Sequence, residues 1–322
     1  LYSLSGGLVM LVGVVALAAR AEGPKGLLFE SAAQAASGNG MLVFLTFFAA
    51  FAIKAPMFPV HTWLPDAAEK APAGTSALLV GVLDKVGTYG MIALCLPIAP
   101  DAAKSAAVPV MVFAVISIFW GAFMAIASND LMRLIAYTSV SHFGFIVLGV
   151  FSGSSTAMTG AIVYMVAHGV ATGALFLTVG FLRRRGGDAL ITTYGGWQRV
   201  TPLIAGVFLV SGLATIALPG LSGFVPEYLV LMGTFKVHRA FALVAVLAVI
   251  LAAVYILLPY QRIFTGPKPD VAAQDLDARE KTVAGILVAA MLALGLFPSP
   301  LVDAVKPTAV QSSTVAIEGS AK

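Results

Sequence analysis

Five ionisable side chains lie inside apolar stretches of this chain, and they are its best candidates for chemistry. They are Lys54, Lys85, His142, His168 and Glu227. A lysine at the centre of a bilayer costs about 3 kcal/mol on insertion scales, so such a residue needs a partner or water. Amines, imidazoles and carboxylates held in this way can take up and release protons near neutral pH. The residue types therefore indicate proton transfer as the candidate chemistry.

Each of these side chains also has an ordinary structural interpretation, which the sequence leaves open. A buried-looking lysine can extend its amine to the membrane interface, and Asp84 can pair locally with its neighbour Lys85. An intramembrane histidine is often a hydrogen-bonding partner between helices. Glu227, which follows a predicted break, can serve only to cap the helix that begins there.

Other chemistries find little support in the sequence. Cys95 is the single cysteine, so neither an intrachain disulfide nor a multi-cysteine iron–sulfur site can form. No cysteine or carboxylate accompanies His142 or His168 at metal-ligand spacing. The glycine-rich stretch 74–87 does not follow a strand, which argues against a nucleotide loop. We expect no nucleophilic catalytic residue, no metal and no cofactor on this chain.

The composition indicates that lipid, and not water, is the main solvent. Of 322 residues, 59% are hydrophobic and only 11% are charged, and the mean hydropathy is +0.96. A soluble domain carries about 25% charged residues, whereas a helix bundle in lipid can face outward with apolar side chains. We predict an all-α membrane protein, a polytopic helix bundle. Its basic residues are scattered over loops, so nucleic acid is not an expected partner.

The apolar pattern predicts nine membrane spans, since about 20 residues cross a bilayer. The expected spans are 4–20, 41–69, 75–98, 107–128, 131–151, 157–182, 202–236, 240–264 and 282–302. Two of them are interrupted halfway, by FAIKAPMFPVHTWLPD (51–66) and ALPGLSGFVPEYLV (217–230). Proline breaks a helix, and non-helical backbone survives at membrane depth only where protein or a wet cavity surrounds it. Two broken helices five spans apart indicate inverted repeats, as in transporters; ordinary proline-kinked packing helices are the alternative.

The basic residues of alternate loops predict the topology. One side carries Lys70, Arg133, Arg183, Arg184, Arg185, Arg199, Arg262, Lys268, Arg279 and Lys281. The other side carries Arg20, Lys25, Lys104, Lys236, Arg239, Lys306 and Lys322. By the positive-inside rule the richer side is cytoplasmic. The short loop with Arg183, Arg184 and Arg185 would then face the cytoplasm and the C-terminus would lie outside.

Four ordered motifs give the chain a specific resemblance. They are FAIKAPMFPVHTWLPDAAEKAPAGTSALLVGVLDKVGTYG, SNDLMRLIAYTSVSHFGFIVLG, MVAHGVATGALF and LPGLSGFVPE. Together they resemble the antiporter-like membrane subunits of respiratory complex I over nearly the whole chain. The acid at Glu227 and the short sequence after the last span resemble the subunit M branch of that family more than the L and N branches.

The resemblance implies a single antiporter-like transmembrane domain over 1–322, with its nine spans corresponding to spans six to fourteen of a fourteen-span subunit and the first five absent. It implies that Lys54 is the broken-helix lysine, Lys85 the central lysine, His142 and His168 relay groups, and Glu227 the terminal residue of the second half. The family's span-five glutamate, the usual partner of the lysine at Lys54, is not in this sequence. The resemblance assigns no role to Asp84.

The function implied by this resemblance is proton translocation within NADH:quinone oxidoreductase of a bacterial plasma membrane. NADH, FMN, iron–sulfur clusters and quinone would then lie in other subunits, and the neighbours would be subunits L and N and membrane lipids. Two alternatives stay open: a subunit of a multisubunit sodium/proton antiporter, and a non-pumping membrane scaffold.

Overall fold

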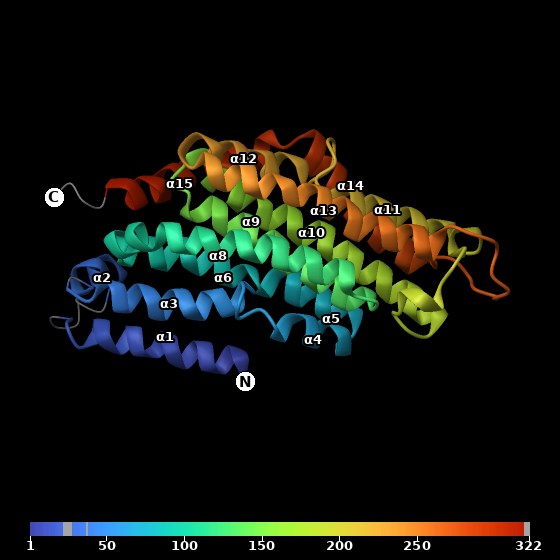
Figure 1. Ribbon diagram of the computed structural model, residues 1–322, viewed down its shortest axis with the longest axis horizontal. Coiled ribbons are helices and arrows are strands. Elements are labelled where there is room, and N and C mark those ends of the chain that lie inside the picture. The colour runs from blue at the N-terminus through green and yellow to red at the C-terminus, as the bar shows by residue number, and fades with distance from the viewer. Residues whose placement is uncertain (22–27, 37, 319–322) are drawn as a thin grey trace.

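The computed structural model describes residues 1–21, 28–36 and 38–318, which form an elongated bundle of helices running mostly lengthwise (Figure 1). Within those ranges the backbone forms no β-strand beyond one isolated bridge between Asp130 and Leu190. Lys25 and Lys322, counted above among the loop charges, lie outside the described residues. The prediction of an all-α bundle is confirmed.

The described chain is a succession of helices. In order along the sequence, they are α1 (Tyr2–Ala18), α2 (Phe29–Ala35), α3 (Gly40–Lys54), α4 (Trp63–Lys70), α5 (Ala73–Leu78), α6 (Lys85–Gly90), α7 (Leu96–Ile98), α8 (Pro100–Ala127), α9 (Leu131–Phe151), α10 (Ser155–Gly186), α11 (Pro202–Thr215), α12 (Phe224–Val237), α13 (Arg239–Phe264), α14 (Ala278–Leu296) and α15 (Ser299–Glu318). Two π-helical segments, η2 (Leu79–Leu83) and η3 (Met91–Cys95), join α5, α6 and α7 into one continuous segment.

Among the described residues, five helical segments are long and apolar enough to cross a membrane: Ala73–Ile98, Pro100–Ala127, Leu131–Phe151, Ser155–Gly186 and Arg239–Phe264. These match five of the nine predicted spans. A sixth candidate is the pair α14 and α15, which is bent by 67°. We expected one uninterrupted span over 282–302, but α14 ends at Leu296. Pro298 and Pro300 favour this bend, because proline removes a backbone donor.

The three remaining predicted spans contain shorter apolar helices. One is α1, and the other two are the segments that we expected to be interrupted. The first is broken between α3 and α4, and the second between α11 and α12. In the second break Ala217 has a φ of 58° and Gly220 a φ of 92°, in the left-handed region that a continuous right-handed helix cannot contain. Both predicted interruptions are therefore present.

Helix α9 is the centre of the bundle. The whole of its apolar window is buried between neighbouring helices. Two glycines allow α8 to approach α9 closely. A Cβ added at Gly121 would lie 2.6 Å from the Ser141 backbone nitrogen, and one at Gly144 would lie 2.6 Å from the Ala114 carbonyl oxygen. Such small-residue contacts bring helix backbones together in membranes, and in this bundle they fix the position of His142.

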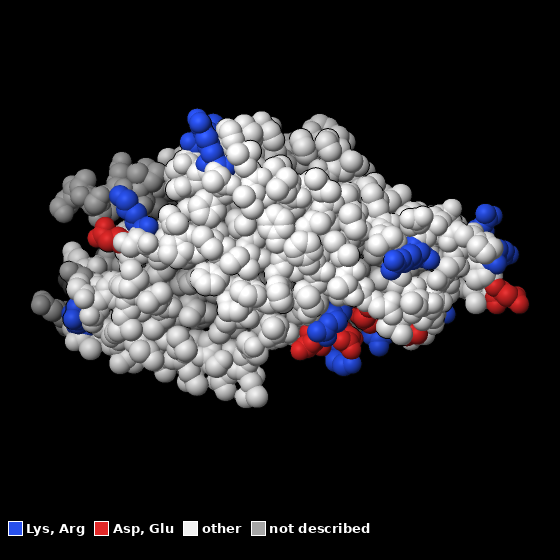
Figure 2. All heavy atoms as spheres, in the orientation of Figure 1, with Lys and Arg blue, Asp and Glu red and all other residues white. Residues whose placement is uncertain are grey.

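On the face shown in Figure 2, charged side chains lie toward the two ends and in one cluster on the lower edge, and the broad middle of that face carries none. Arg133, at the start of α9, binds Asp66 at 2.7 Å and Glu69 at 3.0 Å on α4. Hydrogen bonds from Lys70 and Arg133 lower the pKa of the Glu69 carboxyl. This distribution is that of a bundle with an apolar belt and two wet ends, as a multi-pass membrane protein requires.

A second ion cluster ties the end of α10 to the start of α14. Arg185 lies 2.6 Å and Arg184 3.0 Å from the carboxylate oxygens of Glu280. Glu280 also accepts a hydrogen bond from the Asp277 backbone nitrogen at 3.1 Å, completing a capping box at the start of α14. The cluster joins the long loop before α14 to the bundle.

Candidate functional site

Lys85 lies at the first position of α6, between the two π-helical segments. Its amine donates to the carbonyl oxygen of Val80 at 2.5 Å and lies 2.7 Å from Nδ1 of His168 on α10. It also lies 5.1 Å from the centre of the Phe143 ring, a distance at which a cation is attracted to an aromatic face. π-Helical turns are often found at functional sites because they redirect side chains. Lys85 therefore points inward, and the interpretation as a lysine reaching for the interface is wrong.

The second element of the site is a pair of histidines on neighbouring helices. The rings of His142 on α9 and His168 on α10 are 5.3 Å apart between centroids. Both histidines, together with Tyr164 and Thr172, line a small cavity of about 10 Å³, roughly the room that one water requires. Nε2 of His168 and the hydroxyl of Thr172 have no hydrogen-bond partner among the described residues. These polar atoms and this space suit a water that would join the two rings.

Beyond the cavity, hydrogen bonds run from His142 to Glu227. Nδ1 of His142 lies 2.7 Å from the Tyr164 hydroxyl, which donates to a carboxylate oxygen of Glu227 at 2.6 Å. When Glu227 is ionised, the Tyr164 proton is committed to it, so the Tyr164 oxygen accepts from Nδ1–H of His142. The Tyr255 hydroxyl lies 3.3 Å from the other ring nitrogen of His142. All four side chains are buried.

Glu227 lies in the first turn of α12, directly after the second break. The residue is only 6% exposed, and its carboxylate is stabilised there by the positive end of the α12 dipole. Its carboxylate also accepts a hydrogen bond from Tyr164 on α10, a contact that a residue serving only to cap α12 would not need.

Four of the five predicted residues, Lys85, His168, His142 and Glu227, thus lie on one line together with Tyr164. We call these five side chains the proton line. Lys54 is not joined to it. Lys54 ends α3, and its amine lies 5.9 Å from the centre of the Trp63 ring. No ion pair to Lys54 is formed within the described part of the chain.

Two members of the site were missed by the sequence analysis. Tyr164 precedes His168 by four residues on α10, and residues four apart share a helix face. That spacing was the available signal. Tyr255 is 113 residues from His142, its partner in space. Nothing in the local pattern around Tyr255 indicates that contact.

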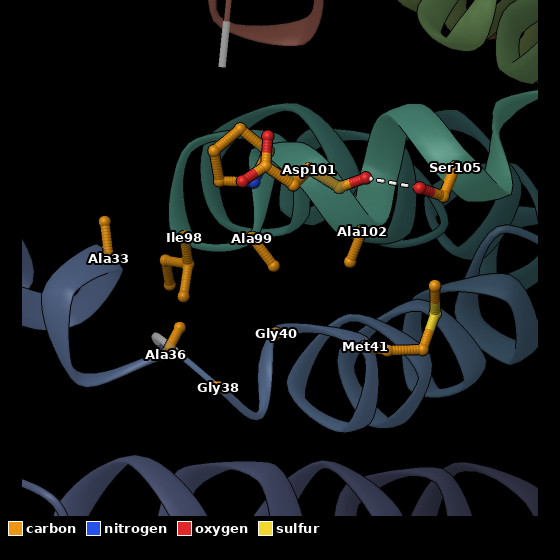
Figure 3. Close-up of a pocket in the computed structure, with 11 residues that line it drawn as sticks. Ala33, Ala36, Gly38, Gly40, Met41, Ile98, Ala99, Asp101, Ala102 and Ser105 are labelled. Atoms are coloured by element: carbon orange, nitrogen blue, oxygen red, sulfur yellow. Dashed lines mark hydrogen bonds between the residues drawn. The ribbon is translucent and has the colours of Figure 1, made fainter. Parts of the chain in front are cut away.

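A separate hollow of about 470 Å³ lies near the start of α8, where α2 and α3 approach it (Figure 3). It is lined mainly by alanine and glycine. Its polar residues are Asp101 and Ser105, and the Ser105 hydroxyl donates to the Asp101 carbonyl oxygen at 2.9 Å. None of the five predicted residues lines it. Among the described residues, no group of three or more histidine, cysteine, aspartate or glutamate side chains is arranged to hold a metal ion.

Two broken helices beside a buried line of amine, imidazole, phenol and carboxylate place the chain in the antiporter-like class of membrane proteins. The family model for NADH:quinone oxidoreductase/Mrp antiporter transmembrane proteins matches residues 1–252. The chain belongs to this family, and the resemblance predicted from its motifs is confirmed.

Similar proteins refine this placement. NADH-quinone oxidoreductase subunit M of Mycobacterium tuberculosis (strain CDC 1551 / Oshkosh) is 43% identical over 98% of the chain, and its Escherichia coli (strain K12) counterpart is 37% identical over 94%. The chain spans 59% and 61% of the lengths of these two curated relatives. A chain of respiratory complex I from Thermus thermophilus superposes with a TM-score of 0.91 at 34% identity, covering 98% of this chain and 68% of that one.

A more distant structure shares the fold alone. It is a chain of the Mrp complex from Dietzia sp. DQ12-45-1b, with a TM-score of 0.84 and 22% identity over 98% of this chain and 66% of that one. The predicted resemblance to the subunit M branch is confirmed by the curated relatives.

Proposed function

We propose that this chain is the proton-carrying part of a membrane subunit of NADH:quinone oxidoreductase, of the subunit M type. One observation carries the proposal: the proton line joins the central lysine to the carboxylate at the second helix break through groups that can each hold and release a proton. The curated relatives named above support the assignment to this complex. A structural scaffold has no need of such a buried polar axis, which is expensive in lipid.

Each link of the line has a definite proton step. Lys85 in its ammonium form gives a proton to Nδ1 of His168, across 2.7 Å. The resulting His168 imidazolium loses the proton on Nε2, and a water in the small cavity passes it to Nε2 of His142, which becomes the imidazolium. When Nδ1 of His142 releases its proton to the Tyr164 oxygen, Tyr164 passes its own proton to Glu227, across 2.6 Å. Glu227 thereby becomes a neutral acid. The line is reset when Glu227 releases this proton, Lys85 takes up a new one and both imidazoles return to their starting tautomers.

Electron transfer from NADH to quinone in other subunits would supply the energy. The flavin, the iron–sulfur clusters and the quinone belong to those subunits in this proposal, and this chain contributes only side chains. Moving one proton against 100 mV costs about 2.3 kcal/mol. Because each pKa unit corresponds to about 1.36 kcal/mol, a change of less than two units at Lys85, caused by a charge change near Lys54, is enough to drive the step.

The same proposal covers the surroundings of the chain. It lies in a bacterial plasma membrane, with Arg183, Arg184 and Arg185 on the cytoplasmic side and the C-terminus outside. The basic cluster at the end of α10 supports this orientation by the positive-inside rule. Subunits L and N are its proposed neighbours, with lipid covering the remaining apolar surface.

The test uses the full-length protein in the assembled complex, with Glu227→Gln and Lys85→Ala as variants and Asp101→Asn as the control outside the proton line. NADH:quinone turnover and proton pumping are measured together in sealed membranes. We expect each variant on the line to lose pumping and coupled turnover by roughly 100-fold, the lower range for a general acid–base group, and the control to keep both.

Three results would contradict the proposal. Normal pumping by both Glu227→Gln and Lys85→Ala would show that neither residue is needed for proton translocation. Loss of assembly without loss of pumping per assembled complex would favour the scaffold. Sodium-dependent pumping in membranes without NADH-linked turnover would favour the antiporter.

A further inference from the structure

Asp84, next to Lys85, is a buried acid that the proton line does not use. Its side chain is 0% exposed, and neither carboxyl oxygen has a hydrogen-bond partner within the described part of the chain. An unpaired buried carboxyl group is expensive, because it gives up its hydration without replacement. A stabilising role in the fold therefore does not explain a carboxyl group at this position.

The packing of α6 shows which way Asp84 faces. A Cβ added at Gly87 would lie 2.4 Å from the Ala55 backbone nitrogen and 2.6 Å from the Phe51 carbonyl oxygen, so this face of α6 touches the end of α3. Asp84 precedes Gly87 by three residues, and helical residues three apart share a face. Asp84 therefore lies on the α3 side, beside the break that follows Lys54.

Lys85 lies on a different face, because adjacent helical residues diverge by about 100°. Its amine is held by Val80 and His168, away from α3. Lys54 and Lys85 are the two cations that act electrostatically on Asp84. The acid is thus the chain neighbour of the first member of the proton line and lies within electrostatic reach of the isolated lysine.

We propose that Asp84 carries protons between Lys54 and Lys85 and so connects the first helix break to the proton line. This inference rests on the proposed function and deepens it. It gives Lys54 an acidic partner from within this chain, and it assigns a role to a residue for which the motifs supplied none.

Two proton transfers make up the step, and each conserves protons and charge. Lys54 in its ammonium form loses a proton to the Asp84 carboxylate, leaving a neutral amine and a neutral carboxylic acid. After Lys85 has given its own proton to His168, the O–H bond of Asp84 breaks and an N–H bond forms on the Lys85 amine. Because the Asp84 oxygens have no hydrogen-bond partner among the described residues, a side-chain rotation or a bridging water must close each gap.

The test compares Asp84→Asn, Asp84→Glu and Thr88→Val in the full-length protein within the assembled complex, with Glu227→Gln as the reference for the proton line. Thr88 is the matched control: it is equally buried on the same helix, and its hydroxyl donates to the Lys85 carbonyl oxygen at 3.1 Å. Asparagine keeps the shape of Asp84 but cannot carry the proton. Glutamate keeps the acid.

We expect Asp84→Asn to lower protons pumped per NADH by about tenfold, below the range of a direct acid–base catalyst because water can bypass one relay group. Asp84→Glu should restore most of the pumping, and Thr88→Val should leave it unchanged. Redox-induced infrared difference spectra should show the carbonyl stretch of a protonated acid in the parent, shifted in Asp84→Glu. The comparison of the parent and Asp84→Glu spectra tests the inference even if the Asp84→Asn variant does not assemble.

Several outcomes would overturn the inference. Normal pumping by Asp84→Asn beside a defective Glu227→Gln would remove Asp84 from the pathway and leave the proposed function standing. An equal loss in Asp84→Asn and Thr88→Val would show only disturbed packing. The absence of any acid band that shifts in Asp84→Glu would show that Asp84 does not change its protonation. Normal pumping by both Asp84→Asn and Glu227→Gln would instead defeat the proposed function itself.

Discussion

The two helix breaks place their ionisable residues in different surroundings. After the second break, Glu227 accepts a hydrogen bond from Tyr164 on α10, and through it reaches His142 on α9. At the first break, the Lys54 amine lies near the Trp63 ring, and the buried acid Asp84 has no hydrogen-bond partner among the described residues. Similar local breaks thus acquire different chemistry from the helices packed against them. The second break ends a proton line, and the first stands apart from it in this arrangement.

Removing the Tyr164 hydroxyl tests the hydrogen bonds that join the second break to His142. Tyr164→Phe keeps the ring and its packing but cuts the link between His142 and Glu227, so we expect proton pumping to fall by about tenfold or more. Tyr255→Phe is the control. Its hydroxyl contacts His142 from the side at 3.3 Å and does not lie between two members of the line, so its loss should be smaller. Equal pumping by Tyr164→Phe and the parent would show that protons reach Glu227 by another path.

The contact between α6 and α3 offers a second test, at the first break. Gly87→Ala would place a methyl group 2.4 Å from the Ala55 backbone nitrogen. Because backbone cannot move aside easily, we expect a destabilisation of about 1–3 kcal/mol, seen as earlier thermal unfolding in detergent. Gly74→Ala is the control, since a Cβ there meets nothing within 4 Å. An unchanged melting temperature for Gly87→Ala would mean that α6 can move away from α3 at little cost, so that the packing at the first break is loose.

The smallest expected effect concerns the ion cluster on α4, beyond the first break. Hydrogen bonds from Lys70 and Arg133 lower the pKa of Glu69 in the folded protein. A lowered folded-state pKa contributes stability above the unfolded pKa, and this contribution is lost as the pH falls through the folded value. We therefore expect the melting temperature to decrease as the pH falls below about 4.3. The decrease should be a few degrees at most, because the ion cluster is partly exposed and its partners Lys70 and Asp66 are open to solvent screening. The melting temperature of Glu69→Gln should lack this additional decrease in the same pH series. If the melting temperatures of Glu69→Gln and the parent decreased equally at low pH, Glu69 would not be the cause of the decrease.

Much of the fold was predictable because its causes are local. In lipid the apolar runs required helices, because a helix pairs every backbone polar group within its own segment. Both breaks followed from proline and glycine, at Pro56 and Pro59 in one segment and at Pro219 and Gly220 in the other. The bend between α14 and α15 was missed although prolines mark it, because the apolar pattern runs through it without interruption.

The site was predictable in its members but not in its connections. Lys85, His142, His168 and Glu227 were identifiable because a polar side chain inside an apolar run is expensive and so calls for a function. Their order in space was not identifiable. Tyr164 has a weak local signal, its spacing from His168, whereas Tyr255 has none. The sequence presents Asp84 only as a local partner of Lys85. The packing of Gly87 against α3 was needed to place Asp84 on the α3 side.

The sequence by itself determined that lipid is the main solvent, where the helices and the two breaks lie, and which residues are able to carry protons. Each of these depends on residues close together in the chain. Tertiary structure alone decided which of these residues communicate. The hydrogen bonds of the proton line join residues 83, 22 and 63 positions apart, and each needs its two atoms to meet within about 3 Å. Helix packing sets such distances. In this protein Gly160 and Gly233 let α10 and α12 approach closely, and Gly169 lets α10 approach the turn before Lys85.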